Sequence, residues 1–382
     1  MACLLRQRRA AKEEQRLWVP YMKIAIVLPP EFKFCARRPH SIETVIRTFA
    51  AYNPWGHELR IFSDGGAEAR CDLAVTELPT GAGRPARLKA AVSALKDFAP
   101  DYIEVHHEAR LASQIARALP AVPVALYRHN YIKPPKNIFQ RLDQTWRYGA
   151  LDRFLFVSND TRDHFLSAFP KFKPRAFSIF NPIDAVKWTG DPEAKDQTIV
   201  FAARAIPEKG LEPLCDGLAE ALPKHPDWRA VLILSAYDDA NTWAHAQVAK
   251  LAGLSDQVTI LTNQPLQVVQ DALAKAAISV IPSVWKDPFP LSALEAHAAG
   301  TAVISSGTGG LRDISGDHAL YLDHVEGPDV AAAIDRLIAD PGLRRQMAAF
   351  GQARARVEHT IPRRAEELNT LREGAVAARK AS

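Results

Sequence analysis

Residues 281–314 read IPSVWKDPFPLSALEAHAAGTAVISSGTGGLRDI and contain a strand, a loop, a helix, a second strand and a turn. The first strand ends at Pro282, and a loop with two prolines follows it. A helix is predicted from Leu291 to Gly300, and the second strand runs into the glycine-rich turn 307–310. Two strands joined through a helix are the repeating unit of a parallel α/β sheet.

The loop before this helix suits an anionic ligand. Free backbone N–H groups and the positive end of the helix dipole favour a phosphate there. Glu295 falls one turn into the helix, where a carboxylate can reach a pair of ribose hydroxyls. Gly309 and Gly310 permit a close backbone approach that side chains forbid, although a Gly-Gly turn in such a domain is usually only a tight turn. The pattern therefore favours a nucleotide site.

Strand and helix patterns alternate along the rest of the chain and restart at Thr198. This alternation predicts an α/β protein with two parallel sheets. The expected domains are 22–187 on the acceptor side and 188–362 on the donor side, and helix 363–382 is expected to pack back on the first. Because ligands of open α/β sheets bind beyond the carboxyl ends of the strands, two such domains facing across a cleft suit a transfer reaction.

The composition is that of a soluble globular protein, with 382 residues, 47% hydrophobic and 24% charged, which favours two domains. No apolar run approaches the roughly 18 residues that span a membrane. Residues 1–21 lack the apolar core of a secretion signal, and we expect a disordered extension there or a true start at Met22. The four cysteines, at positions 3, 35, 71 and 215, show no metal-ligand spacing. Small buried thiols in a cytoplasmic protein explain them best.

The net charge of +5 is uneven, since residues 22–187 hold 24 Lys and Arg against 16 Asp and Glu. This half would be attracted to an anionic ligand or membrane surface, while a solvated surface is the simpler interpretation. The cations are not grouped with aromatic residues, which argues against a nucleic-acid partner.

The segment DPFPLSALEAHAAGTAVI, residues 287–304, resembles the donor-binding signature of the retaining glycosyltransferases of family four, which have the GT-B fold. That signature reads E-P-F-G-L-x-x-L-E-A-M-A-x-G-x-P-V-I and precedes a Gly-Gly turn. Two acids separated by seven residues are retained. The resemblance implies donor contacts in this segment from Asp287, Phe289, Leu291, Ser292 and Glu295.

A second segment, FAARAIPEKGLEPLCDGL at 201–218, resembles the family's G-R-x-x-x-x-K-G strand end. It implies that Arg204 and Lys209 bind the diphosphate and stabilise the charge that develops on it as a leaving group. The segments FVSNDTRDHF, 156–165, and IFNPIDAVKW, 179–188, are similar to the family's V-S helix and interdomain linker.

The first domain matches the family less closely. The resemblance implies that His129, in YRHN, approaches the donor sugar and is catalytic together with Arg204, Lys209 and Asp287. His106 and His107 are candidates for the acceptor side, although a lone histidine at a strand end is often structural. Arg37 and Arg38, in a first loop that lacks the family's glycines, are weaker acceptor-side candidates, and plain loop charge explains them equally well.

Two residues depart from the signature. Asp287 stands where glutamate is usual and is one methylene shorter, so its contact with the donor sugar must shift. Pro290 replaces a glycine and removes one backbone N–H from the loop. The donors of Leu291 and Ser292 would have to compensate for that loss.

The resemblance implies a retaining hexosyl- or N-acetylhexosaminyltransferase that uses a UDP-, GDP- or ADP-sugar and requires neither a metal nor a cofactor. By analogy the acceptor is a glycan or glycolipid in lipopolysaccharide or other surface polysaccharide assembly. We expect the enzyme in the cytoplasm, with peripheral contact to the inner membrane face. The alternatives are a nucleotide-sugar epimerase of GT-B fold and a non-catalytic glycan-binding or scaffold protein.

Overall fold

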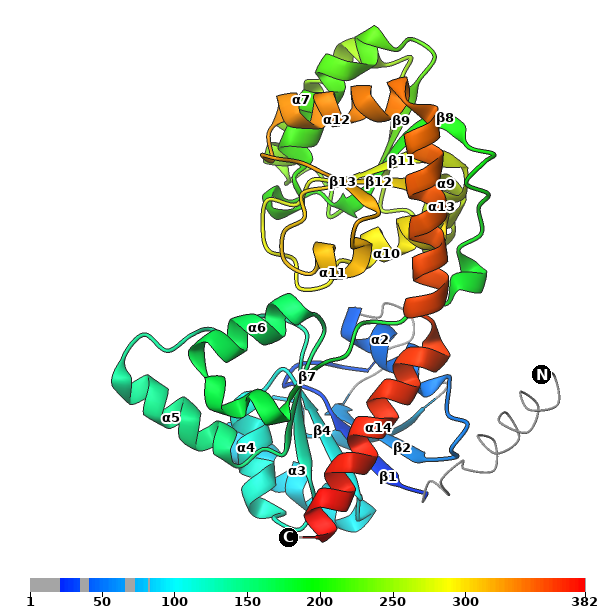
Figure 1. Ribbon diagram of the computed structural model, residues 1–382. Helices are drawn as coiled ribbons and strands as arrows, with labels where there is room; N and C mark the ends of the chain where they lie inside the picture. Colours follow the sequence, from blue (N-terminus) through cyan, green and yellow to red (C-terminus); the bar gives the residue numbers. More distant parts are fainter. Residues whose placement is uncertain (1–20, 35–40, 66–72, 82, 382) are drawn as a thin grey trace, which may run out of the picture. The chain divides into compact units, whose positions relative to one another are not determined.

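The computed structural model describes residues 21–34, 41–65, 73–81 and 83–381 (Figure 1). Contacts between residues divide the chain into two compact units. The first comprises 1–128, 135–155 and 365–382, and the second comprises 129–134 and 156–364. The domain boundaries expected from the sequence stay predictions.

The first sheet has seven strands in the order β3-β2-β1-β4-β5-β6-β7. Its centre is parallel, since β1 pairs in parallel with both β2 and β4. The elements of this part of the chain are β1 (Lys23–Val27), α2 (Ser41–Ala50), β2 (Glu58–Asp64), β3 (Ala74–Leu78), α3 (Arg84–Phe98), β4 (Tyr102–His106), α4 (Ala109–Ala118), β5 (Val124–Arg128), α5 (Ile138–Gly149), β6 (Arg153–Phe156), α6 (Asn159–Ala168) and β7 (Ala176–Ser178).

The C-terminal helix α14 (Ile361–Lys380) packs on the first unit through buried polar contacts. The Arg372 guanidinium donates from Nε and Nη2 to the two carboxylate oxygens of Glu104, at 2.7 and 3.0 Å. Asn369 Oδ1 lies 2.8 Å from Nε2 of His57. Both partners of the Arg372–Glu104 pair are almost fully buried, so each neutralises a charge that the interior would otherwise exclude.

The second sheet has six parallel strands in the order β10-β9-β8-β11-β12-β13. The elements of this part are β8 (Asp196–Arg204), α7 (Leu211–Ala221), β9 (Arg229–Ser235), α8 (Thr242–Ala249), β10 (Val258–Thr262), α9 (Leu266–Lys275), β11 (Ala276–Ile281), α10 (Leu291–Ala298), β12 (Ala302–Ser305), α11 (Leu311–Ser315), β13 (Ala319–Tyr321), α12 (Gly327–Ala339) and α13 (Pro341–Glu358).

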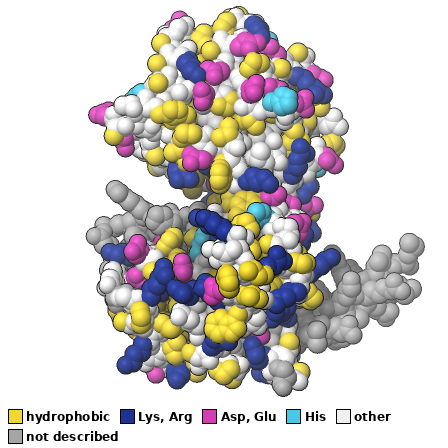
Figure 2. All heavy atoms as spheres, turned by 90° about the vertical axis from the view of Figure 1, so that its left-hand side faces the viewer, with side chains coloured by type: hydrophobic (Ala, Val, Ile, Leu, Met, Phe, Trp, Pro, Cys, Tyr) yellow, Lys and Arg dark blue, Asp and Glu magenta, His cyan; other side chains and the backbone are white. Residues whose placement is uncertain are grey.

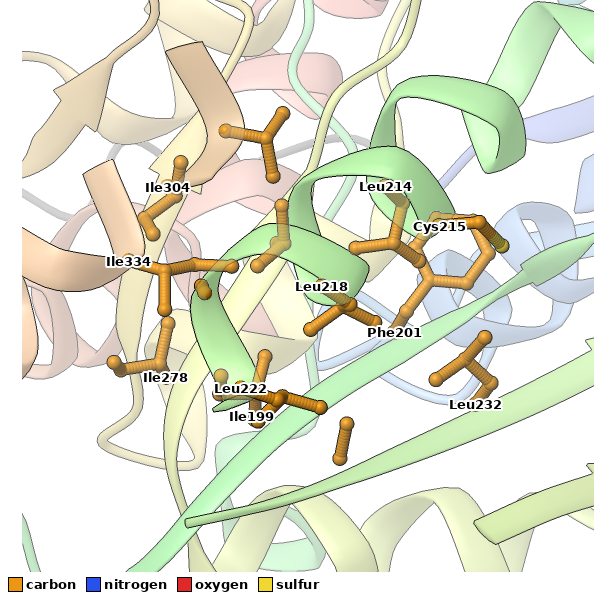
Figure 3. Packing of buried hydrophobic residues seen from close by; sticks show 14 of the residues in the cluster. Ile199, Phe201, Leu214, Cys215, Leu218, Leu222, Leu232, Ile278, Ile304 and Ile334 are labelled. Carbon is orange, nitrogen blue, oxygen red and sulfur yellow. The ribbon is translucent and has the colours of Figure 1, made fainter. Parts of the chain in front are cut away.

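The core of the second unit lies between this sheet and helix α7 (Figure 3). Leu214 and Leu218, four residues apart on one face of the helix, are fully buried beside the strand residues Ile199 and Leu232. Strands buried on both faces read as continuous apolar runs. Residues 198–203 of β8 (TIVFAA) and 276–281 of β11 (AAISVI) accordingly contain no charged residue. The two parallel sheets confirm the predicted α/β class.

Candidate active site

The strand order of the second sheet places the two donor segments side by side. From β8 the chain continues to β9 and β10 in one direction across the sheet, and from β11 to β12 and β13 in the other. The strand order therefore reverses between the neighbours β8 and β11, and open α/β sheets bind ligands at such a switch point. Arg204 is the last residue of β8, and the loop 282–290 follows β11. Segments almost eighty residues apart in sequence therefore meet at one sheet edge.

A close backbone contact holds these segments together. Gly210 has a φ of +75°, and a Cβ there would lie 1.8 Å from the carbonyl oxygen of Pro282. Only glycine fits such a contact. The Val284 N–H also donates to the Glu208 carbonyl at 3.1 Å. The glycine of the K-G pair is thus required by packing against the second loop.

Lys209 and Asp287, both predicted to be catalytic, form an ion pair through Nζ and Oδ2. Their side chains are 22% and 18% exposed, respectively. In this pair the lysine charge is balanced by the carboxylate, and both groups still reach solvent at the sheet edge. The pair can therefore hold the two loops together and still meet a ligand there.

The Gly309–Gly310 turn also contacts this loop. A Cβ on Gly309 would lie 2.3 Å from the Asp287 carbonyl oxygen, and one on Gly310 would lie 2.1 Å from that of Pro288. The Gly310 N–H donates to the Asp287 carbonyl at 2.8 Å. Thr308 Oγ1 adds bonds of 3.2 Å to two further loop carbonyls. In this structure, the glycines allow the turn to support the loop.

Helix α10 starts immediately after the loop, with Pro290 at its N-cap and no side-chain cap. Within the described chain, the N–H groups of Leu291 and Ser292 have no hydrogen-bond partner, because the helix offers none to its first residues. These two donors are the ones that the sequence predicted would compensate for Pro290.

Glu295 lies in the same helix and is half-buried. Burial raises the pKa of its carboxyl from 4.5 to about 7, because close packing desolvates the charged form even where some surface remains exposed. Among the described residues, no group donates a hydrogen bond to this carboxyl. A carboxylate that is desolvated and without a donor is suited to bind the hydroxyls of a ligand.

Phe289, which the resemblance also assigned to the donor, is 6% exposed. Its ring lies 5.7 Å from that of Phe180 and 6.0 Å from that of His359. Burial and the nearby arginine charges lower the pKa of His359 to about 3, so its ring is neutral at ordinary pH. In this structure Phe289 anchors the loop in an apolar cluster, and a contact with the donor stays a prediction.

Arg204 is exposed at the end of β8. His129 follows β5, in the segment 129–134 that belongs to the second unit. Two residues on, the Tyr131 hydroxyl donates to Asp160. Burial, this hydrogen bond and the charges of Asp160, Asp287 and Asp313 raise the pKa of Tyr131. The charge of Asp287 thus acts on Tyr131, which lies in the same short segment as His129.

An acidic residue just beyond the Gly-Gly turn was not predicted from the sequence. Asp313 accepts hydrogen bonds from the N–H of Asn159 at 2.7 Å and of Asp160 at 3.2 Å. A carboxylate is favourable at these first N–H groups of α6. In the sequence, Asp313 is simply the acid that follows the turn in GTGGLRD, residues 307–313. Nothing in that segment indicates which residues it binds.

His107, the acceptor-side candidate, follows β4 in the first unit. Its φ is +62°, which is uncommon for a residue other than glycine. Arg128 donates to its carbonyl oxygen, and burial followed by the Arg128 charge lowers the pKa of His107 to about 4. The neighbouring His106 is buried and stacks on Tyr127, with 5.0 Å between ring centroids. Arg37 and Arg38 lie outside the described residues.

No group of three or more His, Cys, Asp or Glu side chains within the described ranges could hold a metal ion. The expectation that the reaction needs no metal or cofactor stays a prediction.

Comparison with known proteins identifies the family. The model for Glycosyltransferase Family 4 matches residues 41–187, and the model for Glycosyl transferases group 1 matches residues 183–354. The chain belongs to glycosyltransferase family four. Both donor segments, 201–218 and 287–304, lie inside the second match, which confirms the resemblance seen in the sequence.

Two curated relatives and one solved structure show how far this glycosyltransferase resembles others. It is 27% identical to the D-inositol 3-phosphate glycosyltransferase of Kribbella flavida, over 75% of this chain and 73% of that protein. It is 29% identical to an exopolysaccharide phosphotransferase of Streptomyces coelicolor, over 52% of this chain but 21% of that protein. The crystal structure of Anabaena HepE in complex with UDP superposes with a TM-score of 0.75 at 17% identity, covering 91% and 99% of the two chains. The fold is GT-B.

Proposed function

We propose that this glycosyltransferase moves a hexosyl or N-acetylhexosaminyl group from a nucleoside diphosphate sugar to a glycan or glycolipid, with retention of configuration. The observation that carries the proposal is the meeting of Lys209–Gly210 with the loop 282–290 at the switch point. Cations, free helix N–H groups and the half-buried carboxylate of Glu295 come from the segments that meet there, as a diphosphate and a ribose require.

In this proposal the diphosphate binds Arg204, Lys209 and the N–H groups of Leu291 and Ser292. The ribose hydroxyls donate to Glu295. Asp287 has its carboxylate beside Lys209, so a donor phosphate that draws the lysine away would free Asp287 for the sugar hydroxyls.

The transfer step breaks the bond between the anomeric carbon and the diphosphate oxygen and forms one to the acceptor oxygen on the same face. The acceptor proton passes to the departing phosphate oxygen. Arg204 and Lys209 stabilise the charge that develops on that phosphate, and His129 contacts the sugar. The step needs no protein nucleophile.

The acceptor class rests on analogy. We propose a glycan or glycolipid of lipopolysaccharide or another surface polysaccharide, reached from the cytoplasm at the inner membrane face. A uridine nucleotide is the first donor to test, since the HepE structure holds UDP. GDP- and ADP-sugars are the next candidates.

Donor binding tests the proposal directly. A donor at about 100 times its dissociation constant should stabilise the protein by about 2.7 kcal/mol, which a thermal shift assay detects. Lys209→Ala should remove this stabilisation and the turnover, while Lys275→Ala, at an exposed position on α9, should keep both. Binding without transfer or donor hydrolysis would favour the scaffold alternative. Epimerised donor as the product would favour the epimerase.

A further inference from the structure

Helix α5 of the first unit carries large hydrophobic side chains on its solvent face. Ile138, Phe139, Leu142 and Trp146 are 59%, 78%, 60% and 61% exposed. At about 100° per residue, these positions fall within an arc of about 100° on one side of the helix. The buried residue of the helix, Tyr148, lies on the opposite side. Polar residues normally occupy such an outward face, so this arrangement is inverted.

The apolar area is large for a soluble surface. Since an aromatic side chain has roughly 150–250 Å² to bury, Phe139 and Trp146 together leave roughly 300 Å² in contact with water. With Ile138 and Leu142 the patch reaches the size, roughly 300–600 Å², of the largest apolar patches on monomers, which are often functional. A patch of this kind indicates a surface that meets an apolar partner.

Cations flank this face within the first unit. Residues 135–149 contain Lys136, Arg141 and Arg147 against one acid, Asp143, which pairs with Arg147. Arg117 of α4 adds a further charge, with its guanidinium 3.5 Å from the centre of the Trp146 ring. Figure 2, which faces this side, shows hydrophobic side chains among Lys and Arg in the lower half of the view.

We propose that α5 is an in-plane anchor that inserts its apolar face between anionic lipid headgroups. An interfacial helix has apolar and aromatic residues on one face and Lys and Arg beside it, as α5 has. The helix is already formed, and the Asn137 side chain caps it by accepting from the Gln140 N–H at 2.9 Å. Insertion therefore carries no cost of folding the helix.

Charge argues for lipid over a second copy of the chain. Two copies meeting through α5 would bring like cations against each other, whereas phosphate headgroups neutralise them. No helix in the described ranges is long and apolar enough to cross a membrane, so insertion of this kind would be peripheral. The proposal deepens the proposed function, since a glycolipid acceptor would lie at the same surface.

Vesicle flotation of the full chain tests the anchor. Wild type should bind vesicles with about 30% anionic lipid, bind neutral vesicles weakly, and dissociate at about 1 M salt. The double variant Phe139→Gln, Trp146→Gln should lose binding by at least about tenfold. Phe350→Gln, at a 52% exposed aromatic position on α13 in the second unit, is the matched control and should bind like wild type.

Unchanged flotation of the double variant, or no flotation of wild type, overturns the proposal. So does a wild-type dimer without lipid that the double variant disrupts, because α5 would then be a protein interface. Nucleotide binding without vesicles should be the same in wild type and double variant. Its absence in both would refute the proposed function and leave the flotation result to decide the anchor.

Discussion

Replacing Glu295 by glutamine should change the pH dependence of stability. Burial raises the pKa of this carboxyl from 4.5 to about 7, so the folded state holds a proton that the unfolded state has lost between these values. Stability from this group is fully present below pH 4.5 and is lost as the pH rises to about 7. Glutamine has nearly the same shape and does not ionise in that range.

The pKa difference sets the magnitude. At about 1.4 kcal/mol for each pH unit, the step from 4.5 to about 7 corresponds to about 3 kcal/mol. Relative to wild type, Glu295→Gln should therefore gain up to about 3 kcal/mol of unfolding free energy between pH 4.5 and pH 8. Below pH 4.5 the difference between the two proteins should no longer depend on pH.

Urea denaturation of wild type and Glu295→Gln, in parallel at several pH values and without ligand, measures this difference. Other titrating groups are common to both proteins and cancel. Nucleotide binding supplies the opposite readout. A hydrogen bond from a hydroxyl to an ionised carboxylate contributes about 1.5–3 kcal/mol. Above pH 7 the variant should therefore bind the donor at least about tenfold more weakly.

A difference in unfolding free energy that stays constant from pH 4.5 to pH 8 would refute the desolvation of Glu295. A variant that is stabilised at high pH but binds the donor as tightly as wild type would separate the two ideas. The desolvation of Glu295 would then be supported, and its predicted contact with the ribose would be wrong.

Two substitutions test the packing that builds the site and the first unit. Gly210→Ala should cost more than about 2 kcal/mol and weaken nucleotide binding, because its Cβ would lie 1.8 Å from the Pro282 carbonyl; Gly253→Ala, with no atom nearby, is the control, and equal urea midpoints would contradict the packing. Arg372→Leu should cost about 3–5 kcal/mol by leaving the Glu104 charge buried alone. Adding Glu104→Gln should recover part of that loss, and a double variant no more stable than the single would argue against the charge as its cause.

Most elements could be predicted because each has a strong local pattern. Strands β4, β9 and β12 are of this kind, because they read as short, mostly apolar runs typical of buried parallel strands. Strand β3 and the three-residue strands β7 and β13 were not predicted. β3 is an edge strand in which only the last of its five residues is buried, so its sequence AVTEL carries little burial signal.

The sequence named the residues of the candidate site but not the contacts among them. The resemblance to the family's motifs singled out Lys209, Asp287 and Glu295, and the Gly-Gly turn singled out Gly309. The sequence did not indicate that Lys209 pairs with Asp287, or that Gly309 packs on the backbone of that same residue. It also did not indicate the partners of Asp313, because that acid binds the start of a helix about 150 residues earlier.

The sequence alone determined the α/β class, the two-sheet organisation and the family, because periodicity records which face of each element is buried and the signature records its loops. The stretch 281–314 carries all three signals. Only the tertiary structure decided that β8 and β11 are neighbours, and with that the Gly210–Pro282 contact and the Lys209–Asp287 pair. It also decided the pKa of Glu295, because desolvation depends on every atom packed around the carboxyl and not on the residues beside it in the chain.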